Sequence, residues 1–232
     1  MRTTLSVIIP VYNEAPTIQS ILTRLTKQTA CKELIIVDDG STDGSLRLIK
    51  QFLTRRGKQK KPIIKLFTKQ NGGKGSAIRL GLEHVTGTHV LIQDADCEYD
   101  PEDIPALLKP IQRAKAEVVY GSRFAGPHTN LLFWHRVGNH LLNFLVNILY
   151  NTTLSDMETC YKLIPTSLLR QLQVQSDCFA IEPEITCKLL KRGVKIYEVP
   201  ISYSGRDFSQ GKKITWKDGI TALKTIFLLR FS

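Results

Sequence analysis

Two aspartates, Asp94 and Asp96, stand on either side of Ala95, directly after the apolar run of residues 88–93. Carboxylates at positions i and i+2, placed where a buried strand ends, can both turn toward one hard cation that also holds a diphosphate oxygen. Such pairs also arise by chance on solvated turns. The triplet therefore indicates a metal-assisted site only if other polar segments meet it.

Two further strand ends carry polar residues. Tyr12 and Glu14 leave the first β-branched run just after Pro10, which stops backbone pairing there. An aromatic face and a carboxylate at this place could hold a base and a ribose hydroxyl. Asp39 follows a second apolar run that ends at Val37. The first pair also fits a solvated loop, and Asp39 also fits a turn that caps a helix.

The elements that must position these residues alternate along the chain. The sequence predicts strands at residues 5–11, 34–37, 62–67, 88–93 and 116–120, and helices at 15–28, 45–53, 74–84 and after 100, with Ser41 or Thr42 capping the second helix. Near-continuous apolar strands with helices between them indicate an α/β fold with a mostly parallel sheet covered on both faces. Because ligands of such sheets bind at the carboxyl ends of the strands, we expect the acidic residues at one edge.

Two familiar ligand loops can be excluded. The turn Gly72-Gly73-Lys74 lacks the first glycine of a triphosphate-binding P-loop, because Thr68 occupies that position. The segment from Asp39 has several calcium-loop positions, but Lys50 stands where a bidentate Glu is needed. The glycines are expected either to let the backbone approach a nucleotide at a helix start, where free N–H groups and Lys74 favour anions, or to form a plain turn.

Five segments together carry a resemblance to a known family. They read VIIPVYNE (7–14), IVDDGSTD (36–43), NGGKG (71–75), DAD (94–96) and GSRF (121–124). Their order and spacing resemble family 2 glycosyltransferases with the Rossmann-like GT-A fold, most closely the branch of dolichol-phosphate mannose synthases and other polyprenyl-phosphate sugar transferases. The resemblance extends from residue 5 to about residue 215. It implies an inverting transfer of sugar from a nucleotide diphosphate sugar to a polyprenyl phosphate.

The resemblance implies a donor site at the strand ends. The residues it places there are Pro10, Tyr12, Glu14, Val37, Asp39, Lys74, Asp94, Ala95 and Asp96. It also implies Mg²⁺ or Mn²⁺ as cofactor, held by Asp94, Asp96 and Glu98, the last of which stands where the branch commonly has Gln. An extra carboxylate suits a divalent cation and repels the diphosphate without one, so strict dependence on the metal is expected.

The acceptor side is expected to be basic. By resemblance, Arg123 and Arg136 meet the acceptor phosphate and the donor diphosphate, where a guanidinium can make two parallel bonds to phosphate oxygens. Residues 204–213 resemble a flexible loop that closes over both phosphates, with charge from Arg206, Lys212 and Lys213. Each arginine alone also fits a surface charge, and the loop also fits a basic segment without catalytic duty.

One segment departs from the family pattern. Residues 156–162 read DMETCYK, with Cys160 and Lys162 in place of the more usual Gly and Arg. The role of Lys162 stays open at this point. The later run Glu182-Pro183-Glu184 fits either a structural element or a part of the site.

The acceptor decides which chemistry is needed. A polyprenyl phosphate is already ionised at neutral pH, so neutralising charge and aligning three anions suffice, and direct attack inverts the anomeric centre. A saccharide hydroxyl instead requires a carboxylate base, for which Asp156 is the candidate. By resemblance, GDP-mannose is the first choice of donor and UDP-glucose the second.

Composition narrows the class of partner. Of the 232 residues 42% are hydrophobic, and the net charge of +11 favours an anionic partner such as nucleic acid, anionic lipid or a phosphorylated small molecule. Nucleic acid is not expected, because acidic clusters stand where a phosphate backbone would approach and no recognised RNA or DNA motif is present. The five cysteines lack zinc-ligand spacing, which favours reduced thiols in a cytoplasmic protein.

Two amphipathic segments indicate a membrane surface. Residues 131–150 align three asparagines opposite a broad apolar face, and residues 216–231 mix apolar with basic side chains. Both also fit helices packed on the core. Neither is expected to span a membrane, no secretory leader is evident and the chain ends at Ser232. We therefore expect peripheral attachment to the cytoplasmic face of an anionic membrane, or a separate membrane-anchoring protein.

The whole chain, residues 1–232, is expected to form one domain, because no repeat or low-complexity linker interrupts it. Within it, residues 1–125 make the nucleotide-sugar half and residues 126–232 the acceptor and membrane-interface half.

Overall fold

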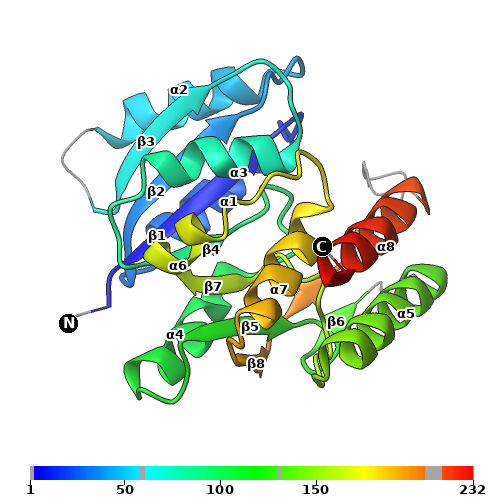
Figure 1. Cartoon of the computed structure of the whole chain (residues 1–232). Helices are drawn as coiled ribbons and strands as arrows, with labels where there is room; N and C mark the ends of the chain where they lie inside the picture. The colour runs from blue at the N-terminus through cyan, green and yellow to red at the C-terminus, as the bar shows by residue number, and fades with distance from the viewer. Residues whose placement is uncertain (1–2, 58–60, 130–131, 207–215, 232) are drawn as a thin grey trace.

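The computed structural model describes residues 3–57, 61–129, 132–206 and 216–231, and its main sheet has seven strands in the order β3-β2-β1-β4-β7-β5-β8 (Figure 1). These strands are β1 (Leu5–Val11), β2 (Cys31–Asp38), β3 (Ile63–Thr68), β4 (His89–Ile92), β5 (Val118–Ser122), β7 (Lys162–Pro165) and β8 (Ile196–Pro200). A separate two-stranded sheet pairs β6 (His128–Thr129) with β9 (Tyr203–Ser204).

Most neighbouring strands run parallel. This holds for β3, β2, β1 and β4, and for the pair of β5 and β8. Only β7, which lies between β4 and β5, is antiparallel to its neighbours in this sheet. The apolar runs at residues 7–9 and 34–37 are fully buried, as expected for strands covered on both faces. The predicted α/β fold with a mostly parallel sheet flanked by helices is confirmed.

Helices alternate with these strands. They are α1 (Ile18–Thr26), α2 (Ser45–Arg56), α3 (Lys74–Glu83), the 3₁₀ turn η1 (Pro101–Asp103), α4 (Ile104–Gln112), α5 (Phe133–Tyr150), α6 (Thr166–Gln171), α7 (Ile181–Lys191) and α8 (Trp216–Phe231). Figure 1 shows α3, α6 and α7 on the face of the sheet turned toward the viewer. The main hydrophobic core lies between the sheet and its covering helices.

One predicted helix cap is wrong. α2 begins after Gly44, whose φ is 95°. The backbone N–H of Ser45 donates a hydrogen bond to Asp43 Oδ1. Ser41 and Thr42 instead hydrogen-bond to the loop that follows β1. They are used to join two strand-end loops, a tertiary contact that local sequence does not reveal.

The register of the sheet brings three strand ends together. Val11 of β1 lies beside Asp38 of β2, and Ile8 of β1 lies beside Ile92 of β4. The segments that leave β1, β2 and β4 therefore emerge at one edge, as predicted for the carboxyl ends of parallel strands.

Helix α5 turns its polar stripe inward. Asn143 is buried and hydrogen-bonds to the backbone of Ser155 and Met157, and Asn147 bonds to the backbone of Leu154. The asparagines thus hold the loop that carries Asp156. The opposite side of the helix exposes Phe133, Trp134, Val137, Leu141, Phe144 and Ile148.

A second apolar cluster joins α5, α7 and α8. Its buried members are Leu142, Val146, Met157, Cys187, Ala222 and Ile226. Beyond this seam, α8 leaves Ile220, Phe227, Leu228 and Phe231 exposed. Within the described ranges, every helix is too short or too polar to cross a membrane.

Candidate active site

Lys74, the first residue of α3, lies between two carboxylates. Its Nζ is 2.8 Å from Asp94 Oδ1 and 3.0 Å from Asp94 Oδ2. The same Nζ is 3.0 Å from Glu182 Oε1 on α7. Lys74 therefore joins the end of β4 to a helix that follows almost ninety residues later along the chain.

A second cluster surrounds Arg206. Its guanidinium lies 3.0 Å from Glu14 Oε2, 2.9 Å from Asp96 Oδ2 and 3.4 Å from Glu98 Oε1. Glu98 also accepts hydrogen bonds from the Tyr203 hydroxyl and from the Arg206 backbone N–H. In this arrangement Arg206, predicted to bind phosphate, and Glu98, predicted to bind metal, are bonded to each other.

The carboxylates at this edge are short of positive charge. Burial, reinforced by the Asp94 and Glu98 carboxylates, raises the pKa of Asp96 to about 7 even though Arg206 opposes the rise. In the described part of the chain, no three His, Cys, Asp or Glu side chains are grouped closely enough to form a metal cage. A cation bound by Asp94 and Asp96 would complete its ligands from another source, such as a diphosphate.

Asp39 organises the glycine turn before α3. Its carboxylate accepts hydrogen bonds from Lys69 Nζ at 2.7 Å, from Gly72 N at 3.0 Å and from Gly73 N at 2.7 Å. The residue predicted to contact the nucleotide therefore also shapes the turn that delivers Lys74.

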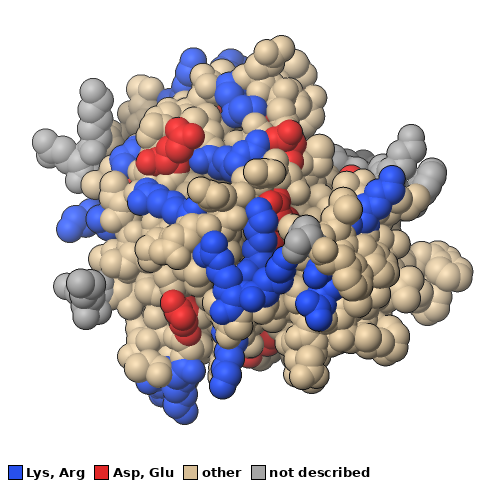
Figure 2. All heavy atoms as spheres, viewed as in Figure 1, with Lys and Arg blue, Asp and Glu red and all other residues tan. Residues whose placement is uncertain are grey.

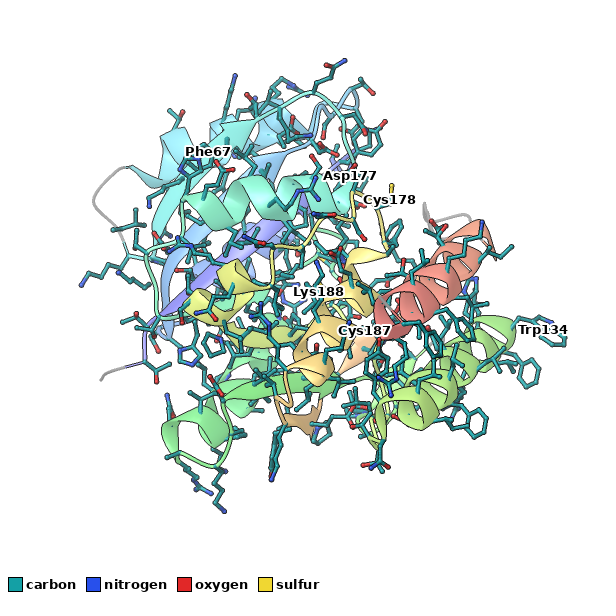
Figure 3. All side chains as sticks on the ribbon, in the orientation of Figure 1. Phe67, Trp134, Asp177, Cys178, Cys187 and Lys188 are labelled. Atoms are coloured by element: carbon teal, nitrogen blue, oxygen red, sulfur yellow. The ribbon has the colours of Figure 1, made fainter. Side chains whose placement is uncertain are left out.

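The glycines of this turn make room for protein backbone. A Cβ on Gly73 would lie 2.4 Å from Asp177 O, and one on Gly75 would lie 2.0 Å from Ser176 O. Gly75 N donates to Asp177 O at 2.6 Å, and Figure 3 shows Asp177 beside the start of α3. The segment before α7 thus occupies the space that side chains at Gly73 and Gly75 would need. The approach of this turn to a nucleotide stays a prediction.

Lys162 belongs to a buried series of charges. Its Nζ lies 2.6 Å from Glu182 Oε2 and 2.9 Å from Met157 O, and its side chain is fully buried. Although burial opposes it, Lys162 and Lys74 hold the pKa of Glu182 below its usual value. The sequence left the roles of Lys162 and Glu182 open, because nothing local shows that α7 packs against β7.

Arg123 and Asp156 form a two-bond ion pair. Arg123 donates from Nε at 2.8 Å and from Nη2 at 2.7 Å, and its backbone N–H donates at 2.9 Å. Asp156 is 0% exposed, and both of its oxygens accept these bonds. The hypothesis that Asp156 is a base for an acceptor hydroxyl does not fit this geometry. Its carboxylate instead orients the guanidinium of Arg123.

Sequence reasoning missed Glu158. Its Oε1 is buried and has no hydrogen-bond partner among the described residues. Burial raises the pKa of Glu158 to about 7, with Lys162 opposing the rise and Glu182 adding to it. A carboxyl group that titrates near neutral pH can serve as an acid or base. The only signal in the sequence is its place two residues after Asp156.

Four other predicted donor residues lie along the strand ends. Pro10 is paired with Val37 across β1 and β2, and Ala95 is buried between the two aspartates. Tyr12 is 39% exposed on the loop after β1. The parallel register therefore places these residues at the same edge as the acidic clusters.

The predicted acceptor arginines lie near one aromatic ring. Phe124 has the Arg123 guanidinium 5.7 Å and the Arg136 guanidinium 6.0 Å from its ring centre. Arg136 is exposed in the first turns of α5. Lys212 and Lys213 lie outside the described residues.

The α/β fold with its mostly parallel central sheet matches solved glycosyltransferase structures with the GT-A fold. Glucosyl-3-phosphoglycerate synthase from Mycobacterium tuberculosis, crystallised with Mn²⁺, UDP and glucosyl-3-phosphoglycerate, matches with a TM-score of 0.75 at 18% identity, over 99% of this chain and 80% of that one. The same enzyme crystallised with Mg²⁺ and UDP matches with a TM-score of 0.73 at 19% identity, over 99% of this chain and 80% of that one. At these identities the match establishes the fold alone.

The family is established by sequence. The model of glycosyl transferase family 2 matches residues 6–173, and the chain belongs to this family. Glycosyltransferase AglJ of Haloferax volcanii is 28% identical over 205 residues, 86% of this chain and 63% of that protein. Dodecaprenyl-phosphate galacturonate synthase of Rhizobium johnstonii is 23% identical over 234 residues, 98% of this chain and 68% of that protein. The chain spans about two thirds of the length of these relatives.

Proposed function

We propose that this chain transfers a sugar from a nucleoside diphosphate sugar to a polyprenyl phosphate, with inversion and with Mg²⁺ or Mn²⁺ as cofactor. The observation that carries the proposal is the meeting of Glu14, Asp94 and Asp96 at one edge of the sheet, beside the cations Lys74 and Arg206. A relative named for a polyprenyl-phosphate sugar product supports the choice of acceptor.

The residues present fit a divalent cation. Burial and, after it, the neighbouring carboxylates Asp94 and Glu98 raise the pKa of Asp96, so added positive charge at this edge is favourable. Asp94 and Asp96 would hold the metal, and Glu98 would join them on leaving Tyr203 and Arg206. When bound, the metal supplies neutralisation of the departing nucleoside diphosphate.

The donor would lie along the strand ends. Around the nucleotide we place Pro10, Tyr12, Val37, Asp39 and Ala95, with the diphosphate toward the end of β4. Tyr12 presents an exposed aromatic face for the base. GDP-mannose is the first donor to test, and UDP-glucose and UDP-galacturonate are the alternatives.

The acceptor phosphate would bind between Arg123 and Arg136, which stand around Phe124. Asp156 holds the Arg123 guanidinium through Nε and Nη2, which fixes its orientation and leaves the N–H groups of Nη1 for a phosphate. An ionised phosphate oxygen needs no base, and the work of these residues is alignment and charge neutralisation. Arg206, together with Lys212 and Lys213, would add charge over the phosphates.

The outward faces of α5 and α8 support attachment to the cytoplasmic face of an anionic membrane, either directly or through a separate anchoring protein. Figure 3 shows Trp134 projecting from the start of α5, away from the rest of the chain, and Trp134 is 78% exposed. In Figure 2, Lys and Arg gather across the middle of the face shown, whereas its right-hand edge, over α5, is uncharged. Arg136 of α5 and Lys224 and Arg230 of α8 are exposed and suit anionic headgroups.

Transfer of radiolabelled sugar to a short polyprenyl phosphate tests the proposal. The three donors would be compared with Mg²⁺, Mn²⁺ or EDTA, alongside Asp96→Ala. We expect lipid-linked product with one donor, lost in EDTA and in the variant. If nucleotide binds in a metal-dependent way but no donor gives a lipid-linked product, the proposal that polyprenyl phosphate is the acceptor is refuted.

The buried oxygen of Glu158 favours one alternative acceptor, a saccharide hydroxyl, with Glu158 as the base in place of Asp156. Under this alternative, product would form on a saccharide, and Glu158→Gln would abolish the transfer while leaving donor binding intact. Transfer to polyprenyl phosphate that survives Glu158→Gln would exclude it.

A further inference from the structure

Four charged side chains alternate in sign from the core to the candidate active site. Lys162 and Glu182 are 0% and 3% exposed, while Lys74 and Asp94 are 12% and 22% exposed. The contacts between neighbours are 2.6 Å, 3.0 Å and 2.8 Å. The series therefore begins in full burial and ends at a carboxylate that faces the proposed metal.

Glu182 divides its two oxygens between two lysines. Oε2 lies against Lys162, and Oε1 lies against Lys74. Lys162 has other partners, since it also donates to the backbone carbonyls of Met157 and Thr159. Lys74 has only carboxylates as ion-pair partners among the described residues, namely Asp94 and Glu182.

A cation bound at Asp94 would change the charge balance around Lys74. The charge of Asp94 would then be shared with the metal, and Lys74 would stand beside a like charge while remaining largely buried. A buried ammonium without a carboxylate partner is strongly unfavourable. Glu182 is the carboxylate that remains for Lys74 in that state.

We propose that Glu182 is a positioning residue for the metal and donor site, which retains Lys74 when Asp94 binds the cation and so lets metal and lysine act on the diphosphate together. This inference rests on the proposed function, because it presupposes a cation at Asp94 and Asp96. Without Glu182, Lys74 and the metal would compete for Asp94.

The competing explanation is that Glu182 only neutralises Lys162. The double variant Glu182→Gln with Lys162→Met separates the two, because it removes that pair together and keeps the net charge at +11. The single variant Glu182→Gln would leave Lys162 buried without its carboxylate partner. It should therefore be less stable under either explanation and does not distinguish them. Glu33→Gln is the matched control, since Glu33 is a buried carboxylate 3.0 Å from Lys65 at the start of β2.

The experiment is Mn²⁺ affinity, measured from the electron paramagnetic resonance signal of free hydrated Mn²⁺, with UDP and separately with GDP. Thermal unfolding of each variant is measured beside it. We expect the double variant to be folded and to bind Mn²⁺ about 10- to 100-fold more weakly than wild type, the usual cost of losing a residue that orients a metal ligand. Glu33→Gln is expected to lose stability and to keep wild-type affinity.

A folded double variant with wild-type Mn²⁺ affinity would overturn the role of Glu182 and leave the proposed metal site intact. A wild-type chain that takes up no Mn²⁺ with either nucleotide would overturn the metal site and, with it, the role of Glu182. An equal loss of affinity in Glu33→Gln would also count against the inference, because the effect would then follow stability alone.

Discussion

Arg206 and Asp96 are 110 residues apart in sequence, yet Arg206 Nη2 lies 2.9 Å from Asp96 Oδ2. The same guanidinium reaches Glu14 at the end of β1. Arg206, two residues after the end of β9, is therefore tied to the ends of β1 and β4, and two of its partners, Asp96 and Glu98, are carboxylates that the proposed cation would use. Binding of the cation would thus be linked to the position of Arg206.

The link predicts the behaviour of Arg206→Gln. Removing a positive charge near Asp96 should tighten Mn²⁺ binding roughly fivefold, from about 1 kcal/mol of Coulomb energy across ~4 Å in water. Sugar transfer should fall, because the side chain of residue 206 no longer forms ion pairs with Glu14 and Asp96. Arg24→Gln, which loses a surface pair with Asp100, is the control and should change neither. Weaker Mn²⁺ binding in Arg206→Gln would contradict the link.

Asp156→Asn should be costly for stability. It breaks the buried two-bond pair with Arg123 and leaves that guanidinium uncompensated, which removes about 3–5 kcal/mol from the free energy of unfolding. Urea unfolding measures the loss. Arg136→Gln is the contrast, because Arg136 is exposed: its stability should match wild type while transfer to polyprenyl phosphate falls.

Glu158→Gln should change how stability depends on pH. The folded-state pKa of Glu158 is raised to about 7 from an ordinary 4.5, so the folded chain holds this proton more tightly than the unfolded chain. The wild type therefore loses stability as pH rises from about 4.5 to 7. The variant should equal wild type near pH 4 and exceed it by on the order of 1–3 kcal/mol at pH 8, measured by urea unfolding. An equal difference at both pH values would contradict this assignment.

Gly75→Ala should destabilise the chain. The added Cβ would lie 2.0 Å from Ser176 O, so α3 and the segment before α7 must separate, at a cost of about 1–3 kcal/mol. Gly138→Ala is the matched control, since a Cβ there meets nothing within 4 Å. It should raise the free energy of unfolding by about 0.5–1 kcal/mol, because Ala favours the helical conformation of α5 more than Gly does. Thermal unfolding distinguishes them. A neutral Gly75→Ala would mean that this packing is loose.

The exposed apolar side chains of α5 and α8 should bind lipid. Replacing Phe133, Trp134 and Phe231 with Ser removes side chains that are 69%, 78% and 76% exposed. At ~1.5–3 kcal/mol each, the loss of three side chains should weaken binding to anionic liposomes at least about 1,000-fold in a sedimentation assay. The control is the double variant Ile63→Ser with Tyr197→Ser, whose side chains are 53% and 45% exposed on β3 and β8, away from α5 and α8. It should leave liposome binding unchanged. Equal losses in both would assign the effect to general surface hydrophobicity.

Much of the fold could be predicted because its signals are local. Apolar runs, helical spacing and the position of Pro10 follow from a few adjacent residues, and they predicted the alternation of strands and helices. The parallel sheet then required Asp39 and Asp94 to meet at one edge, since parallel strands share a carboxyl end. Family motifs added the enzyme class, and the family match bears this out.

The partners of the charged residues could not be predicted in the same way. Lys74 meets Glu182 across more than a hundred residues, and Asn143 faces inward because the loop carrying Asp156 needs its hydrogen bonds. Such pairings depend on how the helices pack against the sheet, and no local sequence pattern encodes that packing. Local sequence patterns are thus enough to predict the order of the elements and the edge of the sheet where the polar residues gather. Which charge neutralises which depends on tertiary packing, because buried charges take whichever partner packing brings within hydrogen-bond distance.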